Sequence, residues 1–367
     1  MTPDAPLESP LSIGIAGAGA IGCGMAALLS EAGHRVSLWS PSGASTVTLA
    51  AGDPLVAQGA VEGSHAIDVV RSAKDLVARA EIVVLAAPAY AHKAIMDAVA
   101  PHLTSRHTVI ISSHASFGAL YLSRLLRDRK VEAPIVAWGT TIVSGRLVSP
   151  GHVRVNTVRG KVDMCTIPAR AGEKGLAVCR RLFGDRFVER DGLLAITLSN
   201  LNPQNHLGIA LCNMTRMELG EDWDQGLHVT PNVGRLLEAL DAERLAIADA
   251  LGVKVRTIFE HFHLSFHVPL SGVSEMNQEM SRLGRGGTGP ASADSRYVTE
   301  DVPYGLVTTT ALADMVDRPA RLHAAGIDLF SALYGRDFRS ANELLPGLRL
   351  DRLSRTQLEN LSRDGFA

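Results

Sequence analysis

The chain has 367 residues, and its formal net charge of −2 arises from 36 basic and 38 acidic side chains. This length suits two domains, and a composition of 46% hydrophobic and 20% charged residues is ordinary for a globular protein with packed cores. The balanced charge, without any polybasic run, argues against nucleic acid or an anionic membrane surface as a partner.

The start of the chain and its cysteines bear on the compartment. The opening "MTPDAPLESPLSIG" has neither the basic nor the apolar region of a signal peptide. The four cysteines are scattered without a C-x-x-C pair, and no apolar run approaches the roughly 20 residues needed to cross a bilayer. We therefore expect a soluble protein in the reducing cytoplasm.

The first predicted elements are a strand, a glycine-rich turn and a helix. An apolar run over residues 11–16 leads into a G-x-G-x-x-G pattern, and helical spacing continues to Gly33. The pattern is weak alone, but between a strand and a helix it has the context that dinucleotide binding requires. The glycines would allow a tight turn, close approach to a pyrophosphate and close helix packing, with N–H groups at the helix start facing the phosphates. A glycine-rich turn without ligand is the alternative; the predicted cofactor contacts are Gly17, Gly19, Ala20, Ile21 and Gly22.

The end of the second predicted strand, 35–39, bears on the choice of cofactor. Ser40 stands where an NAD site usually has an acidic residue, and the next acidic residue after Ser40 is Asp53. Ser40 and Ser42, with Arg35 expected near them, would accept a 2′-phosphate that no carboxylate repels. We therefore expect NADP to be preferred to NAD.

Alternating strands and helices extend this first domain. Apolar runs predict strands over 81–88, 107–113 and 134–143, as in a doubly wound parallel sheet. The strand 81–88 borders the nicotinamide side in such folds, so Ala87 and Pro88 are predicted cofactor contacts, with an ordinary strand-to-helix turn as the alternative. Two more strands, 152–160 and 161–169, are expected to close a Rossmann-type domain over 1–187.

Residues 188–367 are predicted to form a second, mainly helical domain. The segments "LLAITLSN", "GIALCNMTRMEL", "NVGRLLEALDAERLAIADALG" and "GLVTTTALADMVD" have helical spacing and caps. A glycine-rich stretch, "RLGRGGTGPASADS" at 282–295, is either a solvated loop or a mobile lid.

The polar segment "LSNLNPQNHLGI" contains a candidate catalytic histidine. His206 and Asn213 are two helical turns apart, so both would point from one face of the helix that begins here. A helix cap would also explain the polar cluster. The chain has 13 histidines, and any one of them is more often hydrogen-bonded within the protein or exposed to solvent than catalytic.

A second candidate segment is "SRYVTEDVPYGLV", residues 295–307. N-capping and the preference for acids in a first helical turn would explain Glu300 and Asp301, but they do not explain Arg296 and Tyr297.

These motifs together carry a resemblance to a known family. "RYVTEDVPYGLV", "NLNPQNH" and the glycine fingerprint resemble the opine dehydrogenase family, the octopine and nopaline dehydrogenase group. "AHKAIMDAVAPHL" and "HASFGAL" are similar to that family's pattern too, so the resemblance covers nearly the whole chain. It implies a helical second domain like the C-terminal domain of 6-phosphogluconate dehydrogenases, and, with the abundant apolar helix, it suggests a homodimer.

The resemblance also implies an activity. Members of the family reduce the imine formed between a 2-oxo acid and an amino acid or another amine, using NAD or NADP. Their catalytic histidine lies at the start of the helical domain and pairs with an aspartate, which match His206 and Asp301 here. The family pattern has proline after the histidine, and this chain has Leu207.

The chemistry requires such a pair and a place for a carboxylate. An imidazole that titrates near neutrality suits proton transfer, and a carboxylate on its other nitrogen fixes its tautomer. The 2-oxo acid needs a cation or hydrogen-bond donors, although an exposed surface arginine is the ordinary alternative for Arg296. The predicted substrate contacts are Arg296, Thr140, Thr141, Asn202 and Tyr297.

A metal site is not expected. In "HFHLSFH", His263 and His267 have the i, i+4 spacing of a helical metal pair, beside His261. A third ligand is not evident, and the glutamate of H-E-x-x-H is missing.

Two other functions remain open. Ketopantoate reductases and 6-phosphogluconate dehydrogenases also join a Rossmann domain to a helical one, but they use a lysine near the start of the helical domain. Beyond residue 188 this chain has only Lys254, far downstream. A non-enzymatic NADP sensor would need no histidine–aspartate pair, so separation of His206 from Asp301 would favour it.

Overall fold

The computed structural model describes residues 9–366, which form two compact units. The first unit runs to His114 and also contains Gly118–Ile196 and the chain from Asn360 on; the second contains Ala115–Phe117 and Thr197–Glu359. The first eight residues, where no signal peptide is expected, lie outside the described residues. Within the described residues, no helix is long and apolar enough to span a membrane.

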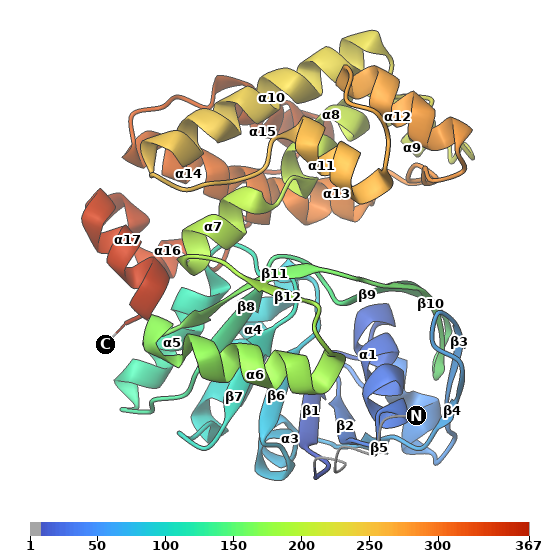
Figure 1. Ribbon diagram of the computed structural model, residues 1–367, viewed down its shortest axis with the longest axis vertical. Coiled ribbons are helices and arrows are strands. Elements are labelled where there is room, and N and C mark those ends of the chain that lie inside the picture. Colours follow the sequence, from blue (N-terminus) through green and yellow to red (C-terminus); the bar gives the residue numbers. More distant parts are fainter. Residues whose placement is uncertain (1–8, 367) are drawn as a thin grey trace, which may run out of the picture. The chain divides into compact units, whose positions relative to one another are not determined.

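An eight-stranded sheet forms the centre of the first unit (Figure 1). Its order is β12-β11-β8-β7-β6-β1-β2-β5, parallel from β8 to β5, with β11 antiparallel to β8. The predicted doubly wound sheet is therefore confirmed, with an antiparallel addition at one edge. The strands are β1 Ser12–Ala16, β2 Arg35–Trp39, β5 Asp68–Val69, β6 Ile82–Leu85, β7 Thr108–Ile111, β8 Ile135–Trp138, β11 Val162–Ile167 and β12 Phe187–Glu189.

Burial on both faces explains why the central strands are so apolar. All residues of β6 and β8 are buried, as are those of β7, because helices cover the sheet and leave little solvent-facing surface for polar residues. The helices of this unit are α1 Ala20–Glu31, α2 Val47–Ala50, α3 Ala73–Arg79, α4 Ala89–Val99, α5 Gly118–Asp128 and α6 Gly172–Phe183.

A second, four-stranded sheet was not foreseen. Its order is β4-β3-β10-β9, from β3 Leu55–Gly59, β4 Gly63–His65, β9 Val143–Ser149 and β10 His152–Val158. The prediction of one strand over 134–143 is wrong, because β8 ends at Trp138 and the chain leaves for this second sheet. The two strands predicted on either side of Gly160 both exist, but β10 and β11 belong to different sheets.

The second unit is helical, as predicted. Its longest helix, α10, contacts α8, α12 and α15 around an apolar core that includes Leu207, Leu237, Met276 and Phe330. The helices are α8 Asn202–Cys212, α9 Met214–Glu218, α10 Pro231–Ala250, α11 Ile258–Phe266, α12 Val273–Arg282, α13 Arg296–Thr299, α14 Val307–Met315, α15 Arg321–Tyr334 and α16 Leu345–Leu348; the chain passes between the units within α7 Gly192–Ser199 and α17 Arg355–Asp364.

Candidate active site

The glycine turn after β1 has the shape expected of a pyrophosphate cradle. Gly17 has φ of +116°, and a Cβ there would clash with the carbonyl oxygen of Ala86. A Cβ at Gly22 would clash with the carbonyl oxygen of Gly17, whereas a Cβ at Gly19 would meet nothing within 4 Å. No side chain caps the first turn of α1, which contains Ala20 and Ile21, so its N–H groups are directed at the space beside Gly19.

This turn lies at the topological switch point of the sheet. The chain proceeds from β1 to β2 on one side and returns to β6 on the other, and ligands bind beyond the carboxyl ends of strands at such a point. The predicted contacts Ala87 and Pro88 lie in the short turn between β6 and α4, and Pro88 is the N-cap of α4.

A buried histidine supports the turn after β6. His92, on α4, is fully buried, and its Nε2 donates to the carbonyl oxygen of Ala87 at 2.9 Å. Burial lowers the pKa of His92 to about 4, so the ring is neutral and its proton is on Nε2. Nothing in the sequence pattern marked His92 as the residue that holds this backbone.

The residues around Ser40 include one correction. Ser40 and Ser42 lie together after β2, with their Oγ atoms 3.4 Å apart. Arg35 is not near them, because it begins β2 and donates to Ser12 at the start of β1, which places it roughly 16 Å away along the strand. Instead Arg71 shares their edge: β5 pairs in parallel with β2, Leu38 opposite Val69, and Arg71 follows two residues later with an exposed side chain.

Thr140 and Thr141 also lie at the carboxyl edge of the parallel strands, after β8. Thr141 Oγ1 donates to the carbonyl oxygen of Val143 at 2.6 Å, and both side chains are partly exposed. The cofactor candidates and the two threonines therefore all belong to one edge of the first unit.

His206 and Asp301 form the pair that the second unit was expected to contain. His206 Nδ1 is 2.7 Å from Asp301 Oδ2, although 95 residues separate them in the sequence. Their side chains are 18% and 17% exposed, so the pair is largely desolvated yet reachable. An NADP sensor would need no such pair, so the separation that would have favoured it is not found.

A π-helical turn aims Asp301 at α8. This turn comprises residues Val302–Leu306. Two of its backbone carbonyl oxygens accept hydrogen bonds from distant side chains: Asn342 Nδ2 donates to that of Pro303 at 2.8 Å, and Ser116 Oγ donates to that of Tyr304 at 2.6 Å. A Cβ at Gly305 would clash with Pro203, so the glycine lets this turn pack directly on the start of α8.

The polar segment before His206 both caps and anchors α8, since Asn200 Oδ1 accepts a hydrogen bond at 3.1 Å from the N–H of Asn202, the first residue of the helix. The N-cap, Leu201, makes no side-chain cap, whereas Gln204 Nε2 donates to Asp241 Oδ1 at 2.7 Å within a buried network. Arg244 completes that network with a hydrogen bond to the same carboxylate at 2.7 Å. Both members of this ion pair are almost fully buried, so removing either would leave the other unpaired.

One expectation about these helices is wrong, and the structure bears on two further points. Asn213 does not continue the helix face of His206, because α8 ends at Cys212 and the Asn213 amide donates to the carbonyl oxygen of Ile209 at 3.0 Å. The side chain of Asp301 makes no cap hydrogen bond, although the residue stands at the N-cap of the π-helical turn Val302–Leu306, and α13 is capped by Ser295. Leu207, where the family pattern has proline, is buried inside α8 and leaves the His206–Asp301 contact intact.

Tyr297 stacks on His206, with ring centroids 3.5 Å apart and planes inclined by 9°. Burial, followed by the charge of Asp301, raises the pKa of Tyr297 to about 12, so its hydroxyl stays protonated. Arg296 is exposed and ion-paired with Glu300. Asn202 lies one turn before His206 on the same face of α8 and is exposed.

The histidines of α11 do not form a helical metal pair. His267 ends the helix with φ of +54°, and His263 Nδ1 donates to the carbonyl oxygen of Val268 at 2.7 Å. Within the described part of the chain, no three His, Cys, Asp or Glu side chains are grouped so that they could hold a metal ion.

Comparison with known proteins gives two family matches along the chain. Residues 189–334 match the model of the NAD/NADP octopine/nopaline dehydrogenase α-helical domain. Residues 13–168 match the model of ketopantoate reductase PanE/ApbA. The helical match covers both His206 and Asp301.

Individual relatives match nearly the whole chain. The chain is 30% identical over 346 residues to the opine dehydrogenase of Arthrobacter sp. (strain 1C), covering 93% of this chain and 95% of the relative. The structure of octopine dehydrogenase with NADH and L-arginine superposes with a TM-score of 0.80 at 16% identity, covering 97% of this chain and 100% of that chain. Yersinopine dehydrogenase with bound NADP+ has a TM-score of 0.68 at 17% identity, covering 97% and 99%.

Proposed function

The chain belongs to the opine dehydrogenase family of nicotinamide-dependent oxidoreductases acting on CH–NH bonds, and from that membership we propose which residues carry its reaction. The reaction condenses a small 2-oxo acid with an amine to an imine and reduces it to an N-substituted amine. The observation that carries the assignment of residues is the 2.7 Å contact between His206 and Asp301 in a desolvated setting.

His206 is the acid and base of this proposal. An ionised carboxylate only accepts hydrogen bonds, so Nδ1 donates to Asp301 and Nε2 is left to exchange protons with the substrate. As the amine adds to the keto carbon, Nε2 takes a proton from nitrogen and gives it to the former carbonyl oxygen, which becomes a hydroxyl. A second transfer of the same kind, from nitrogen to that hydroxyl, breaks the C–O bond, releases water and leaves the imine. Asp301 holds the ring orientation and stabilises the imidazolium between these steps.

The first unit binds the cofactor in this proposal. The open space at Gly19 and the uncapped N–H groups of α1 fit a dinucleotide pyrophosphate. The bound nicotinamide supplies the hydride that reduces the imine carbon. His92 keeps the backbone at Ala87 and Pro88 in place beside that ring.

Within the second unit, the candidates for contact with the substrate carboxylate are Arg296 and Asn202; within the first unit, they are Thr140 and Thr141. The short salt bridge to Glu300 aligns the Arg296 guanidinium while the side chain remains exposed to an incoming anion. A hydroxyl binds a carboxylate by donating its O–H, which is the role assigned to Thr140. Thr141 would first have to release its hydrogen bond to the carbonyl oxygen of Val143.

NADPH is the cofactor that this chain should prefer. The carboxyl edge of β2 carries Ser40 and Ser42 but no acid, and the exposed guanidinium of Arg71 lies at the same edge. Such a set accepts a 2′-phosphate and lacks the carboxylate that selects the 2′-hydroxyl of NADH.

The oligomeric state and the compartment complete the proposal. A homodimer is supported by three exposed leucines, Leu322, Leu329 and Leu333, which follow one face of α15. A cytoplasmic location is supported by four free cysteines, which a reducing compartment would preserve.

A ketopantoate reductase type of reaction is the second candidate, because the first unit matches that family's model. One assay distinguishes imine reduction from ketopantoate reductase chemistry. The protein is incubated with NADPH or NADH, with 2-oxo acids that include pyruvate, and with or without amines that include L-arginine and agmatine. Amine-dependent cofactor oxidation with a secondary amine in the mass spectrum supports the proposal; equal oxidation without amine, yielding a 2-hydroxy acid, contradicts it.

Substitutions of the pair test the roles of its members. We expect His206→Ala to lower kcat by roughly a hundredfold or more, the scale of losing a general acid–base group, with cofactor affinity unchanged. Asp301→Asn should keep the fold and lose much of the rate, since an amide does not stabilise an imidazolium. The double variant should be scarcely slower than His206→Ala, because residues that act as a unit are non-additive. Near-normal kcat in folded His206→Ala protein would remove this histidine from the mechanism.

A further inference from the structure

The glycine-rich stretch at 282–295 is neither loose nor remote from the candidate site. In the structure, residues 286–290 lie against residues 223–225 as a short antiparallel pair, with Asp224 bridged to Thr288. Gln225 N donates to the carbonyl oxygen of Gly287 and Gly289 N to that of Trp223, each at 2.8 Å. Two backbone hydrogen bonds therefore attach the stretch 282–295, hereafter called the glycine segment, to the chain after α9.

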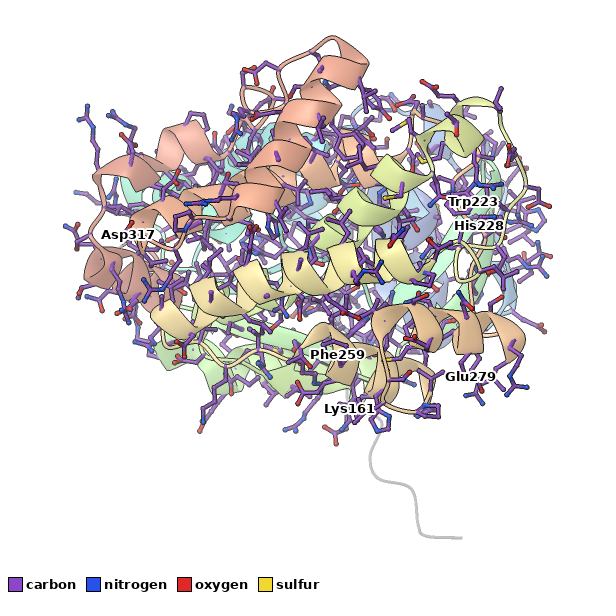
Figure 2. The ribbon with its side chains drawn as sticks, turned by 90° about the horizontal axis from the view of Figure 1, so that it is seen from above. Lys161, Trp223, His228, Phe259, Glu279 and Asp317 are labelled. Carbon is purple, nitrogen blue, oxygen red and sulfur yellow. The ribbon has the colours of Figure 1, made fainter. Side chains whose placement is uncertain are left out.

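Trp223 is the side chain on which the glycine segment rests. It is buried, its Nε1 donates to the carbonyl oxygen of Pro290 at 3.1 Å, and its ring contacts His228 edge-on, beside which it lies in Figure 2. Gly289 packs flat on the indole, and a Cβ there would overlap the ring. Glycine at 289 is therefore required for this packing, whereas a Cβ at Gly287 would meet nothing within 4 Å.

The fixed segment holds Gln225, and Gln225 holds Tyr297. The Tyr297 hydroxyl donates to Gln225 Oε1 at 2.6 Å, across 72 residues of sequence. The opposite end of that tyrosine is the ring stacked on His206. A chain of contacts thus runs from the glycine segment through Gln225 and Tyr297 to the imidazole.

Two contacts fix the orientation of the His206 imidazole, whereas one contact alone would not. The hydrogen bond to Asp301 fixes the direction of Nδ1, but the ring can still rotate about that bond. A flat partner 3.5 Å away removes this freedom, because any tilt of the imidazole would collide with the tyrosine ring. The same face also favours the protonated imidazolium, since a cation is attracted to an aromatic face.

We propose that Tyr297 is a positioning residue for His206, held in place by Gln225 and by the docking of the glycine segment on Trp223. This inference rests on the proposed function, in which His206 transfers the proton. Both the ring and the hydroxyl of Tyr297 are already engaged within the protein, so its effect is on the orientation of the imidazole and thus on kcat.

Steady-state kinetics of Tyr297 variants test the inference. Tyr297→Leu removes the flat partner and should lower kcat about tenfold to a hundredfold, as misplacement of a catalytic group does, with KM for both substrates changed less than about threefold. Tyr297→Phe keeps the ring and loses only the hydrogen bond, so it should recover most of the rate and remain within about tenfold of wild type. A raised KM with unchanged kcat in Tyr297→Leu would overturn the inference and make Tyr297 a substrate contact.

The glycine segment is tested by a matched pair of substitutions. Gly289→Ala and Gln225→Ala should each lower kcat by about as much as Tyr297→Phe, because each breaks the same chain of contacts. Gly287→Ala lies two residues away with open space and should stay within about twofold of wild type, as surface changes usually do. Equal losses in both glycine variants would show a general effect of the segment and contradict the specific role of Gly289.

Two measurements separate this inference from the proposed function. In the His206→Ala background, Tyr297→Leu should have no further effect on residual turnover; a full additional loss would mean that Tyr297 acts independently of the histidine. In NMR spectra of the protein, the ring protons of His206 should shift in Tyr297→Leu but not in Tyr297→Phe, because only leucine removes the ring current. If His206→Ala is active while this shift is seen, the contact exists and the catalytic assignment fails; if His206→Ala is inactive and the shift is absent, the positioning role fails.

Discussion

In the proposed function, cofactor choice depends on very few side chains at the end of β2. Ser40 and Ser42 follow β2, and Arg71 follows the neighbouring strand β5 at the same edge of the sheet. In the proposed site these side chains would meet the 2′-phosphate. Arg71 was not foreseen because it is a neighbour through strand pairing and not through sequence. Arg35, which the sequence placed near Ser40, lies at the opposite end of the same strand.

We predict that Ser40→Asp shifts preference from NADPH toward NADH. The new carboxylate repels the 2′-phosphate and accepts hydrogen bonds from the ribose hydroxyls, so kcat/KM for NADPH should fall by at least about tenfold, the effect of one close charge. Arg71→Ala should weaken NADPH and leave NADH unchanged within about twofold, since only the phosphate meets the guanidinium. The measurement is kcat/KM with each cofactor at saturating substrates.

The control for this pair is Arg35→Ala, which removes an arginine from the other end of β2 and should alter neither cofactor's kcat/KM. A wild-type protein that already prefers NADH severalfold would contradict the whole account of the strand end. Loss of NADPH and NADH activity in equal measure in Arg71→Ala would assign that arginine to the fold instead.

At the scale of elements, Glu243 joins two helices of the second unit. From α10 it accepts hydrogen bonds from the backbone N–H groups of Leu322 and His323, at the start of α15, and from His323 Nδ1 at 2.8 Å. The N-terminus of α15 has no side-chain cap of its own. Glu243 therefore provides from another helix the cap that the local sequence lacks.

We predict that Glu243→Gln lowers the free energy of unfolding by about 1–3 kcal/mol at pH 7. Burial would raise the pKa of Glu243, but the hydrogen bonds from His323 and the two N–H groups hold it below its ordinary value. A carboxyl with a lowered folded-state pKa adds stability above its unfolded pKa and loses it as the pH falls through the folded pKa. The difference between wild type and variant should therefore shrink with acidification, measured by urea unfolding at pH 7 and near pH 4.

Asp249→Asn, an exposed position on the same helix, is the control and should leave stability unchanged at both pH values. A difference between wild type and Glu243→Gln that stays constant with pH would mean that the carboxylate charge contributes nothing and that the variant acts through packing alone.

The elements show which parts of this molecule could be predicted from its sequence. Apolar strands such as β6 and helices such as α10 can be predicted from their composition and from the spacing of their apolar residues, because burial on a sheet or helix face determines both. The short strands β3 and β4 could not be predicted: β3 alternates between buried and exposed positions, but its sequence LVAQG is apolar at both, and β4 has only three residues. The π-helical turn before α14 was invisible for another reason: it depends on Asn342 and Ser116, which reach it from distant parts of the chain.

The candidate site divides in the same way. His206 and Asp301 could be named from motifs that match a family, but their contact is a tertiary fact that spacing alone does not give. Gln225 carried no signal at all, because an isolated glutamine becomes significant only through the tyrosine it meets. The glycine segment was recognised as unusual, yet its role follows from Trp223, which only the fold brings beneath Gly289.

At the scale of the whole molecule, one helix is apolar on two faces. The inner face of α15 contributes Ile327 and Phe330 to the core. On the outer face, Leu322, Leu329 and Leu333 are 36%, 49% and 55% exposed and follow each other at helical spacing. A second apolar face on a helix that already has a buried one implies that something covers it, and a second copy of the chain would do so by isologous packing.

We predict a homodimer that packs through this outer face of α15. Light scattering at micromolar concentration should give twice the chain mass of 39.0 kDa for the wild type. Leu329→Glu combined with Leu333→Glu would bury two charges on each side of a two-fold interface, which costs far more than the leucines contribute, so this variant should have the monomer mass. Leu264→Glu is the matched control, since Leu264 is 50% exposed but lies on α11, and it should remain dimeric. A wild-type mass of one chain would reject the dimer, whereas dissociation by Leu264→Glu alone would place the interface on α11 and leave the apolar face of α15 unexplained.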